Sequence, residues 1–356
     1  MSMKKMIACL LASLGLSAAC AQANYEDTDV KGFAELMEDG DVVVLDVRTA
    51  EEFKEGHLEG AMNIDQAQDD FIQKAKEALP ADKTIAIYCR SGRRSASAAG
   101  RLAAEGYKAV NMKGGITAWK KAQMPVTTEN YEVDVFKTKN GKTVKFYALV
   151  HASIRIVYDG KEIEIDPVTK LGNKRIDYSA MPKADYLFVT HEHGDHFDKE
   201  AIKLLSGDAG THRTLLITNK RCAEMLGYGE VMVNGQNAMF NDIQVEAVPA
   251  YNISEGRTQF HPKGRDNGYI LTIDGLRIYI AGDTEDIPEM QDIKDIDIAF
   301  MPCNQPYTMT TEQLVRAAKT VKPKVLFPYH YGQTDVKGLP SQLKDYGIDV
   351  RIRHYE

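Results

Sequence analysis

The sequence predicts an α/β protein with two domains. Its 356 residues exceed the usual size of one domain, and 44% of them are apolar, which is normal for a globular chain with a sizeable core. Short apolar runs such as 42–45, 84–88 and 186–189 indicate buried strands, and segments of helical pattern lie between such runs. The last two of these strands lead directly into loops rich in reactive side chains, which is where open α/β folds place their sites.

The first residues differ in character from the rest of the chain. Lys4 and Lys5 precede a short apolar stretch, Met6 to Leu16, that is too short to span a bilayer as a stable helix. Ala21-Gln22-Ala23 then forms a small-x-small cleavage site before Asn24. Residues 1–23 are therefore predicted to be a secretory signal peptide, and the protein is expected to be exported to the periplasm.

A second cleavage site remains open. Ser17-Ala18-Ala19-Cys20 resembles a bacterial lipobox, although Ser17 stands where a large aliphatic residue is usual. Cleavage before Cys20 would make the protein a lipoprotein, and it would meet a membrane only in that case.

The charge of the chain bears on its partners, and its cysteine content bears on its disulfide bonds. The net charge of −7 comes without a polybasic block, which argues against nucleic acid and leaves a small-molecule substrate as the expected partner. Beyond the signal region the chain has three cysteines, Cys89, Cys222 and Cys303. An odd number in an exported protein leaves at least one thiol free, and a Cys222–Cys303 pair stays open because sequence does not fix its geometry.

The first domain, residues 25–128, carries a cysteine at a strand-to-helix turn. The strand 84–88 leads into Cys89, and an Ala-rich helix is predicted from Ala96 to Glu105, closed by Gly106. Backbone N–H groups, a helix N-terminus and neighbouring arginines all favour a thiolate, so Cys89 is a candidate nucleophile of low pKa. The alternative is that Cys89 is a small buried apolar residue.

This segment resembles a single-domain rhodanese over nearly all of residues 28–125. The resemblance is carried by Asp46-Val47-Arg48, Glu52-Phe53, Gly56-His57, Gly60 to Ile64, the loop Cys89 to Ser95, and Gly114-Gly115 with Trp119. It implies that Cys89 accepts a sulfane sulfur as a persulfide and passes it to a thiol acceptor. Arg90 and Arg94 are then expected to orient an anionic donor, and Asp46 with Arg48 to form a structural ion pair.

The linker is predicted at 125–130, a short polar segment with a proline, and the second domain at 131–356. Strands are expected at 143–150, 153–158 and 162–165, with a hairpin turn at Asp159-Gly160. A helix is expected from Asp198 to Leu205, with Asp198 as its N-cap. Strand and helix patterns are then expected to alternate to the end of the chain.

The segment after the strand 186–189 concentrates metal-binding side chains. Thr190-His191-Glu192-His193-Gly194-Asp195-His196 places imidazoles and carboxylates within a few residues of each other. Neutral imidazole and carboxylate together suit a divalent ion such as zinc. The alternative is an exposed, solvated loop. Four ligands from one loop cannot close two tetrahedral sites, so further ligands are required from elsewhere in the chain.

Two later strands end at residues of the required type. The strand 278–281 leads to Gly282-Asp283, and the strand 325–329 leads to His330. Taken alone, such an Asp is a turn or cap residue and such a His an ordinary core or loop histidine.

Together these segments resemble the metallo-β-lactamase-fold hydrolases, in particular their phospholipase- and lactonase-like branch, over about 140–335. The resemblance implies an αββα sandwich after the rhodanese-like α/β/α domain. It also implies that His191 and His193 bind one metal, that Asp195, His196 and His330 bind the other, and that Asp283 bridges them. His151, in a His-Ala-Ser motif of that branch, is expected beneath the metals rather than on them.

One imidazole of the family pattern is not at its usual place. After the strand 245–249 the family often has a histidine, where this chain has Ala250-Tyr251-Asn252. We expect His261 to reach the site from a longer loop, because a zinc site with too few protein ligands binds poorly. Otherwise the site lacks one imidazole, and Asn252 holds water or substrate.

The sequence therefore predicts a bifunctional protein. One part is a sulfurtransferase, and the other is a hydrolase with two Zn²⁺ ions in which Asp195 orients the attacking water. Asn304, Tyr307 and Tyr331 follow strand ends and are candidates to line the pocket. One alternative is a persulfide dioxygenase with one Fe²⁺, a family of the same fold that is sometimes fused to a rhodanese. Another is a non-catalytic sulfur-carrier or redox-sensing module.

Overall fold

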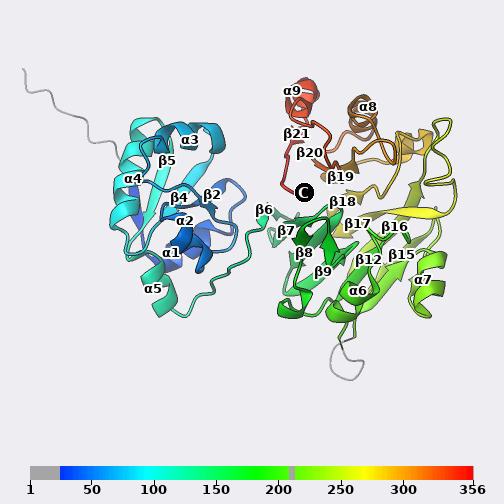
Figure 1. Cartoon of the computed structure of the whole chain (residues 1–356), viewed down its shortest axis with the longest axis horizontal. Coiled ribbons are helices and arrows are strands. Elements are labelled where there is room, and N and C mark those ends of the chain that lie inside the picture. Colours follow the sequence, from blue (N-terminus) through cyan, green and yellow to red (C-terminus); the bar gives the residue numbers. More distant parts are fainter. Residues whose placement is uncertain (1–24, 208–212, 356) are drawn as a thin grey trace, which may run out of the picture.

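The computed structural model describes residues 25–207 and 213–355, which form two α/β units joined by a short linker (Figure 1). The predicted signal peptide, with Cys9 and Cys20, lies outside the described residues, and so does His212, for which we expect a surface position. Within the described ranges, no helix has the length and apolar character needed to cross a membrane.

A five-stranded parallel sheet forms the centre of the first unit, in the order β1-β5-β4-β2-β3. Its strands are β1 (Glu26–Thr28), β2 (Val42–Asp46), β3 (Met62–Asn63), β4 (Thr84–Tyr88) and β5 (Lys108–Met112). Its helices are α1 (Val30–Leu36), α2 (Ala50–Lys54), α3 (Phe71–Ala78), α4 (Arg93–Ala104) and α5 (Gly115–Lys121). Ile85 and Ile87 of β4 point into one apolar cluster, and Ala86 and Tyr88 point into another, so the sheet is covered on both faces.

The second unit is built on two seven-stranded sheets. The first sheet, in the order β14-β13-β12-β9-β8-β7-β6, contains β6 (Glu132–Lys137), β7 (Thr143–Val150), β8 (Ser153–Tyr158), β9 (Lys161–Ile165), β12 (Tyr186–Val189), β13 (Leu215–Thr218) and β14 (Glu230–Val231). The second, in chain order, contains β15 (Asn237–Phe240), β16 (Ile243–Ala250), β17 (Asp266–Ile273), β18 (Leu276–Ile280), β19 (Ile298–Pro302), β20 (Val325–Tyr329) and β21 (Asp349–Val350). A small hairpin joins β10 (Lys170–Leu171) to β11 (Lys174–Arg175).

Helices cover the outer faces of both sheets. They are α6 (Lys199–Leu205), α7 (Lys220–Leu226), α8 (Thr311–Val321) and α9 (Leu339–Leu343), with 3₁₀ turns η1 (Tyr178–Ala180), η2 (Pro288–Asp292) and η3 (Lys344–Tyr346). The inner faces of the two sheets share one apolar cluster, in which the rings of Phe146 and Phe300 lie 5.8 Å apart. Leu205 of α6 packs in a second cluster and Leu314 of α8 in a third, on the outer faces (Figure 1). The predicted αββα sandwich is confirmed.

Most predicted elements are found, and two predictions are corrected. The helix expected from Ala96 begins at Arg93, because Gly92 adopts a left-handed conformation, with φ of 88°, and so ends the preceding loop early. The expected alternation of strands and helices fails for β15 to β18, which are antiparallel neighbours without a helix between them. Asn241 between β15 and β16 and the Asp274-Gly275 pair between β17 and β18, all with positive φ, reverse the chain in tight turns that leave no room for a helix. The longer loop 251–265, between β16 and β17, contains no helix.

The remaining cysteine question is answered by the structure. Cys222 and Cys303 are both free and buried, so the pair that the sequence left open is not present. Burial raises the pKa of each thiol to about 12, which makes both poor nucleophiles.

The linker is held against the first unit. The Trp119 indole N–H donates to the Pro125 carbonyl at 2.7 Å, and the backbone of Thr127 pairs with that of His57 at 2.8 and 2.9 Å. Across the junction, Lys145 of β7 lies 2.9 Å from the carboxylate of Glu38. The two units are therefore in direct contact.

Candidate functional site

Loops from both sheets of the second unit bring the predicted ligands together. His191 to His196 follow β12, Asp283 follows β18 and His330 follows β20, while His151 lies in the turn between β7 and β8. The His330 N–H donates to the His151 carbonyl at 3.1 Å, which ties a loop of one sheet to a loop of the other. The site therefore exists only where the two sheets meet.

The first cluster contains His191, His193, His261 and Asp283, whose ligand atoms all lie within 4.8 Å of one another. His191 Nε2 lies 3.1 Å from His193 Nδ1, and His261 Nε2 lies 3.4 Å from Asp283 Oδ2. The loop between β16 and β17 thus brings His261 to the position at which the sequence lacked an imidazole.

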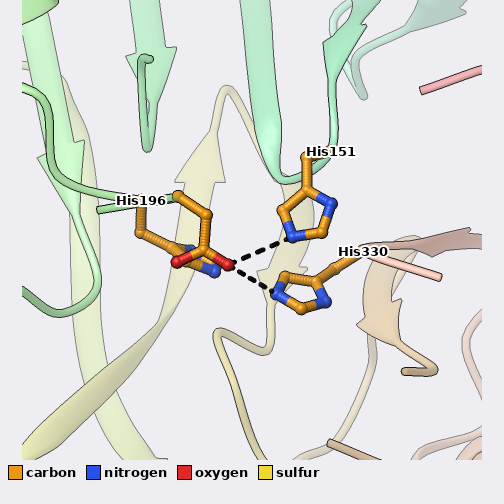
Figure 2. Close-up of side chains that lie close together, drawn as sticks. His151, His196 and His330 are labelled. Carbon is orange, nitrogen blue, oxygen red and sulfur yellow. Dashed lines mark ion pairs between the residues drawn. The ribbon is translucent and has the colours of Figure 1, made fainter. Parts of the chain in front are cut away.

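The second cluster contains His151, Asp195, His196 and His330, again with ligand atoms within 4.8 Å of one another. Asp195 Oδ2 lies 3.3 Å from His151 Nε2 and 3.5 Å from His330 Nε2. Figure 2 shows the imidazoles of His151 and His330 turned to the same carboxylate, with His196 beside it. His151, expected beneath the metals, thus has its Nε2 among the ligand atoms of this cluster.

Asp283 lies between the two clusters. Its Oδ1 is 3.2 Å from His196 Nε2, and its Oδ2 is 3.2 Å from His330 Nε2 as well as close to His261. With 2% of its surface exposed, this carboxylate faces imidazoles of both clusters. It occupies the place that a bridging ligand requires.

Two buried carboxylates, to which the sequence analysis assigned no role, fix the orientation of the imidazoles. Asp166 Oδ2 accepts from His196 Nδ1 at 2.8 Å, and Asp266 Oδ2 accepts from His261 Nδ1 at 3.0 Å. In each ring the other nitrogen, Nε2, is thereby directed at Asp283. Such carboxylate–histidine pairs are usual behind metal ligands, where they set the tautomer and raise ligand basicity.

The buried polar atoms fit a cation. His196 Nε2, His261 Nε2, His330 Nε2 and Asp283 Oδ1 are all buried and find no hydrogen-bond partner within the described part of the chain. Buried polar atoms without partners are rare, and these converge on the space between the clusters. Imidazole and carboxylate donors in this number match a site for divalent transition ions.

The electrostatics of the two clusters agree with that reading. Burial lowers the pKa of His191 well below its ordinary value, which keeps the imidazole neutral and able to ligate. Burial opposes charge on His330 too, but Asp283 and Asp195 outweigh it and raise the pKa of His330 to about 9. The carboxylates thus favour a positive charge between the two clusters. A bound divalent ion would supply this charge, and the imidazoles could then be neutral.

Backbone strain is also concentrated here. His151, Asp166 and His330 have φ values of 55°, 43° and 48°, in the left-handed region that non-glycine residues seldom adopt. Such strain persists where the surrounding structure imposes it, commonly at functional sites.

The Asp166→Asn variant is expected to bind metal about 10–100-fold more weakly, because the amide cannot hold His196 as the carboxylate does. Asn tolerates the left-handed backbone, so the change is confined to the hydrogen bonds. Competition with a chelator measures the affinity. Asp159→Asn is the matched control, since Asp159 has a φ of 51° but lies exposed in a hairpin turn. Equal affinity of the two variants would contradict an orienting role for Asp166.

Other predicted site residues have different positions. Glu192, within the motif, faces Arg221 at 3.1 Å and Arg265 at 3.5 Å and belongs to neither cluster. The Asn252 amide is buried and donates to the carbonyls of Tyr307 and Arg257, so it joins two loops rather than taking the place of His261.

The three residues proposed to line the pocket lie in the loops that follow β19 and β20. Tyr307 is 46% exposed and packs edge-on against Phe260, the residue before His261, at 5.1 Å. Asn304 lies close to Gly332, two positions after His330. Tyr331 donates from its hydroxyl to the Arg353 carbonyl at 2.5 Å, which directs it toward the C-terminal segment.

The second reactive centre surrounds Cys89, in the first unit. Its Sγ accepts from the Gly92 N–H at 3.2 Å and from the Ser95 hydroxyl at 3.4 Å. Burial by itself raises the pKa of Cys89, but these donors and the N–H groups of Ser91 and Ser95 outweigh it and lower the pKa below its ordinary value. The loop is thus arranged to stabilise a thiolate.

The arginines of this loop differ in their environment. The Arg94 guanidinium forms a bidentate pair with Glu52, with both contacts at 2.7 Å, while Arg90 is exposed. The sequence analysis did not predict the role of Glu52 as the partner of Arg94. Asp46 and Arg48 form the expected ion pair, at 2.6 Å.

Ser95→Ala is expected to raise the pKa of Cys89, because the thiolate loses the hydroxyl donor while its burial is unchanged. The pH titration of thiolate absorbance in the ultraviolet then shifts to higher pH. Ser97→Ala, at an exposed position of the same helix, is the control. An unshifted titration in Ser95→Ala would show that the hydroxyl does not stabilise the thiolate.

Comparisons with known proteins agree with this geometry. Residues 29–122 match the rhodanese-like domain model, and residues 145–330 match the beta-lactamase superfamily domain model. A UPF0173 metal-dependent hydrolase of Archaeoglobus fulgidus is 31% identical over 185 residues, which make up 48% of this chain and 78% of that protein. One from Geobacillus thermodenitrificans is 32% identical over 192 residues, or 51% of this chain and 82% of that protein.

Solved structures give the same result for the second unit. A metal-dependent hydrolase of Parabacteroides distasonis is 50% identical, with a TM-score of 0.61, over 64% of this chain and 100% of its own. Igni18, a metallo hydrolase of the archaeon Ignicoccus hospitalis, is 26% identical, with a TM-score of 0.50, over 59% of this chain and 94% of its own.

Proposed function

Because the chain belongs to the beta-lactamase superfamily of metal-dependent hydrolases and carries a rhodanese-like domain before that fold, we propose a dinuclear zinc hydrolase joined to a sulfurtransferase. The observation that carries the first half is the pair of His/Asp clusters with Asp283 between them. The thiolate-stabilising loop around Cys89 carries the second half.

The clusters divide the ligands between two ions. His191, His193 and His261 would hold the first ion, and Asp195, His196 and His330 the second, with Asp283 shared. Two ions bound there would act as Lewis acids and would lower the pKa of coordinated water from about 15.7 to about 7, which would supply a nucleophile at neutral pH.

Asp195 has the properties of the residue that orients the attacking water. Its side chain is 34% exposed, in contrast to the 2% of Asp283, so it can be reached from solvent. Burial opposes its ionisation, but the neighbouring imidazoles of His151, His196 and His330 keep the pKa of Asp195 well below its ordinary value. It is therefore a carboxylate at neutral pH, able to accept a hydrogen bond from water and fix its direction.

Metal content tests the proposal against the one-iron dioxygenase. The second cluster of donors favours two ions, because a single-ion enzyme would leave these buried groups without a function. After anaerobic purification we expect two zinc ions per chain by elemental analysis. One iron per chain, with oxygen uptake on glutathione persulfide, would establish the dioxygenase instead.

The substrate class is tested directly. A panel of phosphodiester, thioester and lactone substrates should show one class hydrolysed in a metal-dependent manner. No hydrolysis of any class by the two-zinc protein would favour the non-catalytic sulfur-carrier or redox-sensing module.

The sulfurtransferase half follows from the Cys89 loop. The thiolate attacks the sulfane sulfur of an anionic donor, takes it as a persulfide and releases the donor's remaining anion, and a thiol acceptor then removes the outer sulfur. Arg94, near the thiolate, and the exposed Arg90 are proposed to orient the donor.

Export completes the proposal and rests on the sequence of residues 1–23. The mass of the mature protein distinguishes cleavage before Asn24 from lipidation at Cys20. A protein that retains residues 1–23 in its native host would contradict both.

A further inference from the structure

We propose that the second metal site binds its ion more tightly than the first, because His151 supplies it with an additional donor. The inference rests on the two-ion function proposed above and concerns the difference between the sites. It makes the second ion the more firmly held one and leaves the first as the exchangeable one.

The position of the His151 ring is that of a ligand. Its Nε2 lies 3.3 Å from Asp195 Oδ2, and its ring centre lies 3.7 Å from that of His330. The side chain is buried among the donors of the second cluster, in which Figure 2 shows it beside His330 and opposite His196. An ion held by Asp195, His196 and His330 is therefore also within reach of His151.

The backbone holds His151 in this position. Its N–H donates to the Tyr355 carbonyl at 3.1 Å, and its carbonyl accepts from the His330 N–H at 3.1 Å. With φ of 55°, the residue has little freedom to adopt another orientation while both bonds persist. A donor fixed before the ion arrives loses less conformational freedom on binding, which favours affinity.

The C-terminal segment that supplies the Tyr355 carbonyl is itself anchored. The Tyr355 side chain is 1% exposed, and the Arg353 guanidinium donates to both carboxylate oxygens of Asp134 in β6, at 2.7 and 2.6 Å. The C-terminal segment thus connects His151 to β6, the edge strand of the first sheet.

The donor sets of the two sites then differ. The first site has three imidazoles of its own, from His191, His193 and His261, and the second has three imidazoles and the Asp195 carboxylate, while both share Asp283. More donors and one more negative charge make the second site the tighter one. With one donor fewer, the first site leaves more room for a reactant, so we place the exchange of substrate there.

Stepwise removal of zinc from the full chain tests this. The protein loaded with zinc is dialysed against increasing EDTA, and bound zinc per chain is measured by elemental analysis. Wild type is expected to lose one ion at low EDTA and to retain the other to a concentration at least about 10-fold higher. His261→Ala should retain the tight ion. His151→Ala should lose it at an EDTA concentration at least about 10-fold lower than wild type, because even changes to residues behind metal ligands lower metal affinity by about this factor.

The matched control is His354→Ala, because the His354 side chain is 88% exposed and lies in neither cluster. It should release zinc as wild type does. Thermal unfolding shows whether each variant is folded. If His151→Ala does not fold, the zinc-release curves of wild type and His261→Ala still test the inference.

Each outcome has one meaning. Loss of both wild-type ions in a single step, or loss of the tight ion in His261→Ala, overturns the inference. So does a folded His151→Ala that keeps the tight ion as wild type does. A wild-type chain that binds fewer than two ions under saturating zinc contradicts the proposed two-ion function itself.

Discussion

Asp283→Asn is expected to lower metal-dependent hydrolysis by more than about 10³-fold. The variant loses the carboxylate that the two ions would share, so the pKa of coordinated water should fall less far from about 15.7 toward 7. Asp283 is buried and faces His196, His261 and His330, which are imidazoles of both clusters. The variant should also bind less than two zinc ions per chain. Turnover on the substrate found in the panel and elemental analysis measure the two effects.

Asp286→Asn is the matched control for this experiment. Asp286 lies three positions along the chain and pairs with Arg316, whose side chain is 60% exposed, so the pair contributes at most about 1 kcal/mol. The control should retain zinc and turnover. If Asp283→Asn keeps both ions and most of its activity, Asp283 is not the bridging ligand.

Cys89→Ser is expected to reduce sulfur transfer from thiosulfate to cyanide to the uncatalysed level, because an alcohol does not form the persulfide. Hydrolysis by the second unit should be unchanged, since Cys89 belongs to the core of the first unit. Thiocyanate formation measures transfer, and the mass of one added sulfur atom on the intact chain reports the persulfide.

Cys222→Ala serves as the control for removal of a buried thiol. Burial raises the pKa of Cys222 to about 12, so its loss should leave sulfur transfer intact. Transfer that persists in Cys89→Ser would show that the rhodanese-like domain does not use this cysteine. A loss of hydrolysis in the same variant would show instead that the two units depend on each other.

Local patterns predicted much of this protein. The β-branched runs at 42–45 and 84–88 became β2 and β4, and the Asp159-Gly160 turn joined β8 to β9, because side-chain burial and turn chemistry act over a few residues. The alternation expected after α7 was wrong for a related reason. Strands of an antiparallel meander and strands linked by helices have the same apolar pattern. Only the connections between the strands distinguish the two arrangements.

The two carboxylates behind the imidazoles show the limit of such patterns. Asp166 follows β9 and Asp266 begins β17, and the sequence analysis predicted no function for either. Their function depends on a hydrogen bond to a histidine on another loop, His196 in one case and a near neighbour, His261, in the other. A signal was available for Asp166, since a non-proline residue before Pro167 at a strand end often marks a turn, but it did not name a partner.

The sequence by itself determined which side chains are the candidates for the chemistry: the motif from His191 to His196, Asp283 and His330 after their strands, and Cys89 in its arginine-rich loop. It could do so because strand ends and ligand spacing are local properties. The tertiary structure alone decided how these groups combine. It brought His261 into the first cluster and His151 into the second, and it placed Asp283 between them, because the distance between loops of different sheets depends on how the two sheets pack.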